Sequence, residues 1–348
     1  MIDLIPLTQQ VLRLATGRKT YQEVCDKQWT LCPGESVVSG PAIYLDEELD
    51  KVTAVPPDTT YAYEIGRIHG GQTEHGATTA YQLSNAHLLK GYVYKGSMKH
   101  SLVTKKESLF NSSVTEYIPK AALASTFSGI RYFGHWLTDD LTLALAAQQL
   151  AKPVAVAREL TDHQVEYRDL FDIHTIPVTK ASCGELIIID DIGQNRFKRE
   201  RYEYMRSQLK KFGLVQPHQG VMFLRGTSGV QRLLVNEDEV AEFLKNRGFA
   251  IINPSRMSAS EIVRQTLGAK LIVGVEGSQL THGLFSMADD GTLLTLQPPY
   301  RFNNVYKDYT DCLGMKYAFV VGKEVADGFE INLEDLARTL DKIENHQL

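Results

Sequence analysis

The chain has 348 residues, of which 43% are hydrophobic and 23% charged, and its net charge is −5 at neutral pH. This length predicts about two domains, and the composition is typical of a soluble globular protein rather than a disordered one. The negative charge argues against a general nucleic-acid binder, which would present a basic face.

Targeting signals and cysteine pairs are not evident in the sequence. Residues 1–19 lack the basic start and long apolar core of a signal peptide. No apolar run approaches the roughly 20 residues of a membrane helix. The cysteines are scattered without a C-x-x-C pair, so neither a zinc site nor a disulfide framework is indicated. They are Cys25, Cys32, Cys183 and Cys312. We therefore expect a cytoplasmic protein.

The first half begins with a β-rich segment, residues 36–104. It is rich in Val, Ile, Tyr and Thr, with Gly, Pro and Asn between the runs, and the run TYAYEIGRI (60–68) is one predicted strand. Its tyrosines either line an acceptor groove or pack a sheet face. They are Tyr61, Tyr63, Tyr81, Tyr92 and Tyr94. The region 120–214 is predicted to be α/β, because a largely buried helix (136–150) precedes two short strands and a basic amphipathic helix (196–213).

The second half shows strands alternating with helices of about ten residues, which predicts βαβ units and a parallel sheet. Predicted strands are 221–224, 249–253, 271–275, 292–296 and 316–321. We expect Asn236 to cap one intervening helix, with Glu239 three residues on, and Ser258 with Glu261 to form a capping box on the next.

This pattern predicts three parts along the chain. Residues 1–214 form an N-terminal domain, and 215–325 form a Rossmann-like domain that begins with a linker at 215–220. Residues 326–348 form an amphipathic helix, for which packing on the first domain is one option.

Polar groups gather at two strand ends of the second half. The strand–turn–helix of 271–286 would leave backbone N–H groups pointing outward at a helix start, which suits an anion. Arg225 and Arg232 flank the preceding loop, where two guanidiniums would grip a diphosphate. The alternative for the turn is an ordinary strand–turn–helix corner. The alternative for the two arginines is that they are solvated or pair with Glu237 and Asp238.

A third polar stretch lies in the first half. His135 and Asp139 are four residues apart and would share one helix face, whereas Asp140 would point about 100° away. A histidine and an aspartate on one face could be a general base and the group that orients it. The alternative is an exposed first helical turn whose acids favour the helix dipole.

These three stretches, in this order, resemble motifs of the inverting glycosyltransferases of family 61, including bacterial members linked to surface polysaccharides. HWLTD (135–139) is similar to the HW-x-x-D motif of the family, and Arg232 with LVNED (234–238) to its arginine and I-x-N-E. GVEGSQLTHGLF (274–285) is similar to G-x-H-G-A-G-L-T-N-x-L-F. The resemblance covers roughly residues 80–345.

The resemblance implies a GT-B fold, in which two Rossmann-like domains face a cleft. It implies metal-independent transfer of a hexose or pentose, with inversion, from a nucleotide-diphosphate sugar to a glycan hydroxyl, in bacterial polysaccharide or lipopolysaccharide assembly. The acceptor would be a glycan or glycolipid bound by the first domain, and no cofactor or nucleic acid is implied. No D-x-D tract is placed to hold a metal. A peripheral contact with the inner membrane face, the oligomeric state, the sugar and the linkage are left open.

Residue roles follow from the same resemblance. Asp139 is the candidate base and His135 its orienter or the alternate base. The diphosphate would be bound by two arginines and two backbone N–H groups, namely Arg225, Arg232, Gly277 and Ser278. The rest of the donor pocket would be Asn236, Glu237, Glu276, Thr281 and His282.

One departure from the family motif concerns Glu276, which stands where the family has histidine. An ionised carboxylate cannot donate to phosphate, so we expect it to accept from a ribose or sugar hydroxyl. Ser278, Gln279 and His282 also depart from the motif. The Glu276 departure favours the alternative of a non-catalytic nucleotide-binding or scaffold protein. An NAD-dependent epimerase would carry G-x-G-x-x-G after its first strand, which this chain lacks.

Overall fold

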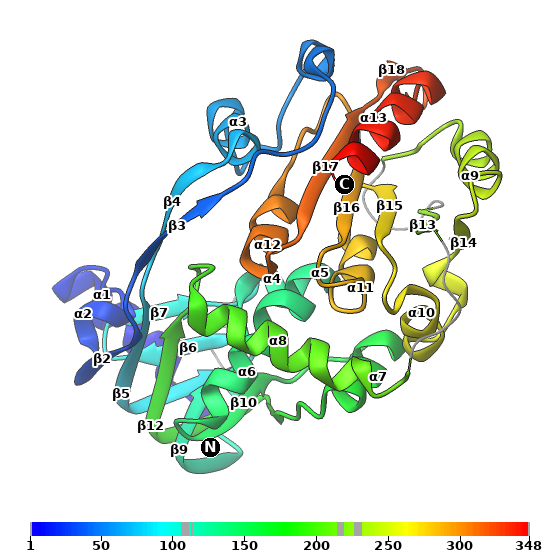
Figure 1. The fold of residues 1–348 in the computed structure, drawn as a ribbon. Helices are drawn as coiled ribbons and strands as arrows, with labels where there is room; N and C mark the ends of the chain where they lie inside the picture. The colour runs from blue at the N-terminus through cyan, green and yellow to red at the C-terminus, as the bar shows by residue number, and fades with distance from the viewer. Residues whose placement is uncertain (1, 106–110, 113, 214–218, 226–231, 347–348) are drawn as a thin grey trace. The chain divides into compact units, whose positions relative to one another are not determined.

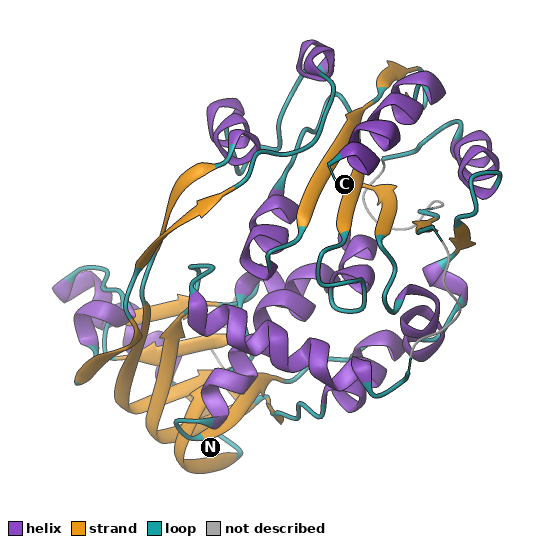
Figure 2. Cartoon of the chain, in the orientation of Figure 1, coloured by secondary structure: helices purple, strands orange, loops and turns teal. Residues whose placement is uncertain are grey.

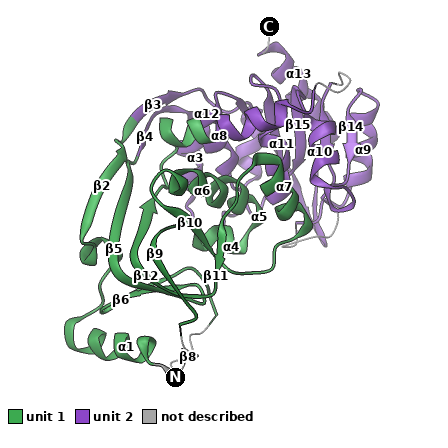
Figure 3. Cartoon of the chain, turned by 90° about the horizontal axis from the view of Figure 1, so that it is seen from below, with its two compact units in different colours: residues 1–35, 76–201 green, residues 36–75, 202–348 purple. Residues whose placement is uncertain are grey.

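The computed structural model describes residues 2–105, 111–112, 114–213, 219–225 and 232–346 (Figure 1). The chain forms two compact units: unit 1 contains residues 1–35 and 76–201, and unit 2 contains residues 36–75 and 202–348 (Figure 3). Each unit combines helices with a sheet, so the predicted α/β class is confirmed (Figure 2). Among the described residues, no helix is both long enough and apolar enough to cross a membrane.

Unit 1 is built on a mixed eight-stranded sheet of order β11-β10-β9-β12-β5-β6-β7, with β2 paired to β5. Neighbours from β11 to β12 are parallel, and the other pairs are antiparallel. The strands are β2 (Lys27–Cys32), β5 (Thr78–Leu89), β6 (Tyr92–Lys95), β7 (Met98–Ser101), β9 (Glu116–Leu123), β10 (Lys152–Val156), β11 (Ile176–Val178) and β12 (Lys180–Asp190). A separate pair joins β1 (Ile2–Asp3) to β8 (Asn111–Ser112).

The helices of unit 1 include the buried segment expected from the alanine- and leucine-rich run. Helix α6 (Leu141–Gln148) packs on β9, β10 and β12. The others are α1 (Ile5–Thr16), α2 (Tyr21–Val24), α4 (Phe127–Arg131), α5 (Phe133–His135), α7 (Asp162–Phe171) and α8 (Arg196–Lys210), whose last residues belong to unit 2. A π-helical turn, Trp136–Asp140, joins α5 to α6.

Unit 2 contains the predicted parallel sheet, which has five strands in the order β14-β13-β15-β16-β17. The strands are β13 (Val221–Phe223), β14 (Ala250–Ile252), β15 (Leu271–Val275), β16 (Thr292–Gln297) and β17 (Lys316–Val321). The chain starts in β13, moves outward to β14 and then returns to β15 on the other side. The strand order therefore reverses between β13 and β15, and ligands of such sheets bind at the carboxyl ends of the strands at this point.

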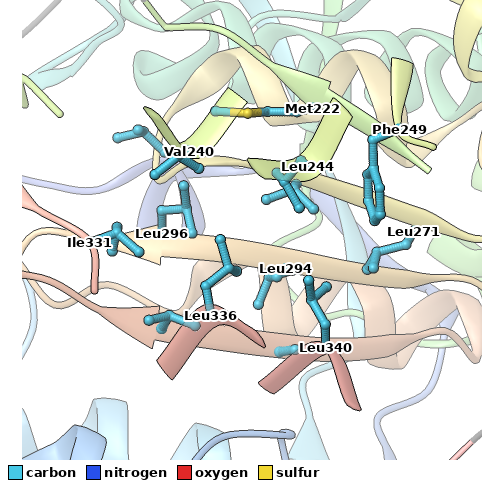
Figure 4. Packing of buried hydrophobic residues seen from close by; sticks show 14 of the residues in the cluster. Met222, Val240, Leu244, Phe249, Leu271, Leu294, Leu296, Ile331, Leu336 and Leu340 are labelled. Atoms are coloured by element: carbon cyan, nitrogen blue, oxygen red, sulfur yellow. The ribbon is translucent and has the colours of Figure 1, made fainter. Parts of the chain in front are cut away.

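Helices cover both faces of this sheet. On one face, α9 (Glu237–Lys245) and α13 (Leu333–Asn345) place apolar side chains on the strands (Figure 4). This cluster includes Val240, Leu244, Leu294, Leu296, Leu336 and Leu340. On the other face, α11 (Thr281–Leu284) lies against β13 and β15, and α12 (Val305–Leu313) packs on β17. Helix α10 (Ala259–Thr266) packs on α11.

The rest of unit 2 consists of shorter elements. They are β3 (Glu35–Ser39), α3 (Tyr61–His69), β4 (Gly71–His75), β18 (Lys323–Val325), β19 (Gly328–Glu330) and the 3₁₀ helices Asp46–Lys51, Pro254–Arg256 and Ser278–Leu280. Strand β3 pairs with β4, and β18 pairs with β19.

Two local predictions are wrong. The run 60–68 forms helix α3 rather than a strand, because the Thr60 hydroxyl caps it by accepting from the Tyr63 N–H at 3.2 Å. Asn236 does not cap α9, since its side-chain amide bonds to the backbone of Ile331 instead. The capping box of Ser258 and Glu261 is confirmed. The predicted linker lies mostly outside the described residues.

Candidate functional site

The first polar cluster lies in unit 1, where α5 runs into the π-helical turn. His135 Nδ1 is 2.8 Å from Asp139 Oδ2, so the two side chains meet as their spacing predicts. The exposed fractions of their side chains are 36% and 22%, so both reach solvent. Single π-helical turns are frequent at functional sites, because they turn a side chain out of the regular helical register.

The other carboxylate oxygen of Asp139 faces a buried lysine. Lys198 Nζ, from α8, lies 3.5 Å from Asp139 Oδ1 and 3.5 Å from Asp191 Oδ2, and it donates to the Asp191 carbonyl at 2.8 Å. Arg201 binds both carboxylate oxygens of Asp191 at 2.8 Å. Asp139 is therefore held from two sides, by the imidazole and by a cation that is itself fixed.

The pKa values of the pair move in opposite directions. Burial raises the pKa of Asp139, but the charge of Lys198 and the hydrogen bond from His135 outweigh it, and the net pKa is lowered. Burial lowers the pKa of His135, but Asp139 outweighs it through its hydrogen bond and charge, and the net pKa is raised. Asp139 is thus an ionised acceptor for Nδ1–H, which leaves Nε2 of His135 to exchange a proton.

Asp140 does not join this pair. Its carboxylate is buried and accepts from the N–H and the hydroxyl of Thr126, the N-cap residue of α4, at 2.8 Å each. Burial is the main reason that the pKa of Asp140 rises to about 7. Its role here is to hold the start of α4 against the π-helical turn.

The second polar cluster lies in unit 2 at the reversal point of the sheet. Arg225 follows β13 and Glu276 follows β15, and these strands are neighbours. Arg225 Nη1 donates to the Glu276 carbonyl at 3.2 Å and to Gln279 Oε1 at 2.9 Å. Arg232 Nη1 donates to the same carbonyl at 2.7 Å and lies 2.6 Å from Glu276 Oε2. We call Arg225, Arg232 and Arg301 the arginine cluster.

The arginine cluster carries more positive charge than its neighbours cancel. Arg301, after β16, lies with Nε 3.9 Å from Glu276 Oε2, so three guanidiniums lie near two carboxylates, those of Glu276 and Glu237. Burial lowers the pKa of Arg232 and raises that of Glu276, whose side chains are only 8% and 5% exposed. Among the described residues, Nε of Arg232 and Nε of Arg301 have no hydrogen-bond partner. The arrangement can therefore accept a multiply charged anion.

Gly277 allows the close approach of Arg225. Its φ is +152° and its ψ is 169°, a region that only glycine adopts readily, and an added Cβ would lie 2.0 Å from Arg225 Nη1. The Gly277 carbonyl accepts from the Tyr306 hydroxyl at 2.7 Å. The same hydroxyl lies 2.9 Å from the Thr281 hydroxyl. A 3₁₀ turn precedes the four residues of α11, so the helix dipole is small and the arginines supply most of the positive charge.

The other predicted donor residues differ in where they lie. Glu237 adjoins the arginine cluster, because its carboxylate accepts from the Arg225 N–H at 2.7 Å. Ser278 is half-buried in the turn. Asn236 instead ties α9 to Ile331, and the buried ring of His282 packs edge-on to Phe223. The structure thus brings together Arg225, Arg232, Glu237, Glu276 and Gly277. Asn236 and His282 instead contact Ile331 and Phe223.

Several residues of these clusters are not among those predicted from the sequence. Arg301 follows the carboxyl end of a strand, and the rule that indicated Arg225 and Glu276 could have found it. Tyr306 and Lys198 had no such signal, because a helical pattern does not show which polar side chain turns inward.

An α/β unit with arginines at its reversal point is typical of proteins that bind phosphorylated ligands. Residues 133–294 match the family described as Glycosyltransferase 61, a span that contains all three motifs. No curated protein matches the chain. The match confirms the resemblance and supports membership of the chain in glycosyltransferase family 61, which implies glycosyltransferase activity.

Proposed function

We propose that the protein is an inverting glycosyltransferase that moves a sugar from a nucleotide-diphosphate donor to a glycan hydroxyl. The observation that carries this proposal is the arginine cluster at the reversal point of the parallel sheet. As the glycosidic bond to the diphosphate breaks, negative charge grows on the leaving oxygen. Fixed guanidiniums stabilise that charge more in the transition state than in the bound donor, which accelerates the reaction.

His135 and Asp139 would supply the base. The acceptor oxygen attacks the anomeric carbon on the face opposite the diphosphate, and its proton passes to the base. We assign that proton to Nε2 of His135, with Asp139 orienting the ring. Two observations support this assignment: both oxygens of Asp139 are engaged, and its lowered pKa makes it a weak base. The reverse assignment, Asp139 as the base, is the alternative.

A pH profile separates the two assignments. If neutral His135 is the base, kcat/KM rises with pH through the raised pKa of the imidazole. Asp139→Asn removes the charge that raises this pKa, so the acidic limb moves to lower pH while the rate falls by roughly 10²–10⁴-fold. His135→Gln then removes the limb. If His135→Gln retains the limb, the base is another group. Nucleotide binding serves as the control, because neither substitution touches the arginine cluster.

Donor binding is tested by thermal shift against a panel of nucleotide-diphosphate sugars. A ligand at 100 times its Kd adds about 2.7 kcal/mol to the free energy of unfolding. Arg232→Ala should abolish this shift, whereas Arg256→Ala, at an exposed position of the same unit, should leave it unchanged. A panel without any stabilising nucleotide would contradict the proposal.

The proposal includes finer points that rest on the family resemblance. These are a GT-B organisation with an acceptor-binding first domain and a donor-binding second domain, transfer of a hexose or pentose without a metal, and a cytoplasmic role in bacterial polysaccharide or lipopolysaccharide assembly. Full activity in EDTA would support metal independence.

A second candidate function is a non-catalytic nucleotide-binding or scaffold protein. Glu276 favours it, because the carboxylate lies 2.6 Å from Arg232, where a phosphate oxygen would otherwise bind. Nucleotide binding without transfer or donor hydrolysis for any sugar would support this function over the transferase.

A further inference from the structure

A cavity of about 620 Å³ lies in unit 1 beside helix α1 and strands β6 and β7. Its lining includes five basic residues, Arg13, Arg18, Lys19, Lys99 and Lys105. Within the part of the chain that the structure describes, no aspartate or glutamate lines it. We call this feature the basic cavity.

The positive charge of the basic cavity does not follow from the overall charge of the chain. The whole chain has a net charge of −5, so five basic side chains in one lining are a local concentration of positive charge. Like charges around one cavity repel, and the repulsion is relieved when an anion binds. Among the described residues, no ion pair involves Arg13, Arg18 or Lys105.

The walls of the basic cavity are fixed by contacts within unit 1. The side-chain amide of Gln9, in α1, donates to the Ser97 carbonyl at 2.7 Å and ties the helix to the turn between β6 and β7. The Tyr92 hydroxyl donates to the Lys105 carbonyl, and the ammonium group of Lys99 lies 4.4 Å from the centre of the Tyr92 ring. A cavity of this size with preformed walls is typical of a small-molecule site.

Apolar groups complete the lining. The rings of Tyr21 and His100 meet edge to face with centroids 5.1 Å apart, and Met98 and Val103 lie in the same lining. A surface with cations on one part and rings and methyl groups on another fits an organic molecule that bears phosphate, rather than a bare inorganic ion.

The basic cavity is separate from the pair His135 and Asp139. The helix that follows Asp139, α6, packs on β9, β10 and β12, whereas the cavity adjoins β6 and β7 at the sheet edge. Strands β6 and β7 lie two and three places from β12, which is about 10 and 14 Å at the usual strand spacing. The cavity is therefore not part of the proposed base site.

We propose that the basic cavity binds a phosphate-bearing organic ligand, either a phospholipid headgroup or a free phosphorylated molecule. The proposal does not depend on sugar transfer, because the cavity shares no residue with the arginine cluster or with the histidine–aspartate pair.

The test uses the full chain and two probes. Calorimetric titration with inorganic pyrophosphate should lose one binding site, or weaken it at least tenfold, in Arg18→Gln/Lys105→Gln. Both side chains are exposed, so folding should be unaffected, as an unchanged thermal midpoint would show. The matched control Lys152→Gln/Lys323→Gln changes the charge equally at exposed positions outside the cavity and should retain the site.

The second probe identifies the source of the ligand. Co-sedimentation with phosphatidylglycerol vesicles, compared with phosphatidylcholine vesicles, should be lost in Arg18→Gln/Lys105→Gln if a lipid headgroup binds. Pyrophosphate binding without vesicle binding supports a free phosphorylated ligand. If the double variant and the control bind both probes like the wild type, the proposal is wrong. An arginine-cluster site would survive in the double variant, so failure of the transferase proposal is a separate result.

Discussion

Lys198 offers the sharpest test of the charge network in unit 1. The side chain is 3% exposed, and Lys198→Met would keep its length and remove its charge. Asp191 would retain its two bonds from Arg201, but Asp139 would lose the cation 3.5 Å from Oδ1. Removing one partner of a buried ion pair destabilises a protein by about 3–5 kcal/mol. Because Asp139 is 22% exposed and keeps its bond to His135, we expect about 3 kcal/mol.

The effect should depend on pH with a definite sign. Lys198 contributes to the lowered pKa values of both Asp139 and Asp191, although burial opposes the shift. A carboxylate with a lowered pKa in the fold adds stability above its unfolded value, near 3.9, and loses it as pH falls through the folded value. The wild type should therefore exceed Lys198→Met most at pH 7, and the difference should shrink below about pH 4.

Urea denaturation at pH 7 and pH 3.5 measures both quantities. The control is Lys120→Met, since Lys120 forms an exposed pair with Glu185 at 3.4 Å, with side chains 50% and 40% exposed. Such a pair contributes less than about 1 kcal/mol, so this control should unfold almost like the wild type. If Lys198→Met matches the control at pH 7, or if its deficit is the same at both pH values, the lysine does not hold Asp139 ionised.

Three further predictions concern substitutions of single residues. The pKa of Asp140 is raised to about 7, so the fold prefers the protonated acid, and the wild type should lose up to about 4 kcal/mol of stability as the pH rises from about 4 to 7. Asp140→Asn should not show this loss, and denaturation of both proteins at pH 5 and pH 8 measures the difference. Glu276→Gln should tighten pyrophosphate binding severalfold, because the carboxylate 2.6 Å from Arg232 no longer competes, and calorimetry showing equal or weaker binding would refute this. Gly277→Ala should lower the free energy of unfolding by about 1–3 kcal/mol and weaken pyrophosphate binding, because the new methyl group displaces Arg225; unchanged affinity would count against the site.

The parallel sheet of unit 2 could be predicted because its signals are local. Buried strands are continuous apolar runs, and the capping box at Ser258 and Glu261 marks a helix start within four residues. The strand order could not be predicted, since it depends on contacts between distant segments. The strand predicted at 60–68 was wrong because tyrosine and isoleucine favour strands in a local pattern. The Thr60 cap, and the burial of Glu64 and Ile68 one helical turn apart, favour the helix instead.

The polar cluster around Asp139 could likewise be predicted only where its residues are close in the sequence. The spacing of His135 and Asp139 was enough to predict their contact, because both residues lie on one helix. Lys198 comes from another helix, and a basic amphipathic pattern predicts that its charges face water. Only the fold shows that this lysine is buried between two aspartates.

The substitution at position 276 can be judged from what holds the arginines. Arg225 and Arg232 both donate to the carbonyl oxygen of Glu276, and a main-chain contact does not depend on the side chain. A histidine there would leave these two anchors in place and would remove one negative charge from the arginine cluster. The glutamate therefore lowers the positive charge of the proposed donor site without dismantling it. Glu276 is therefore better explained as a change in donor affinity than as the loss of a binding site.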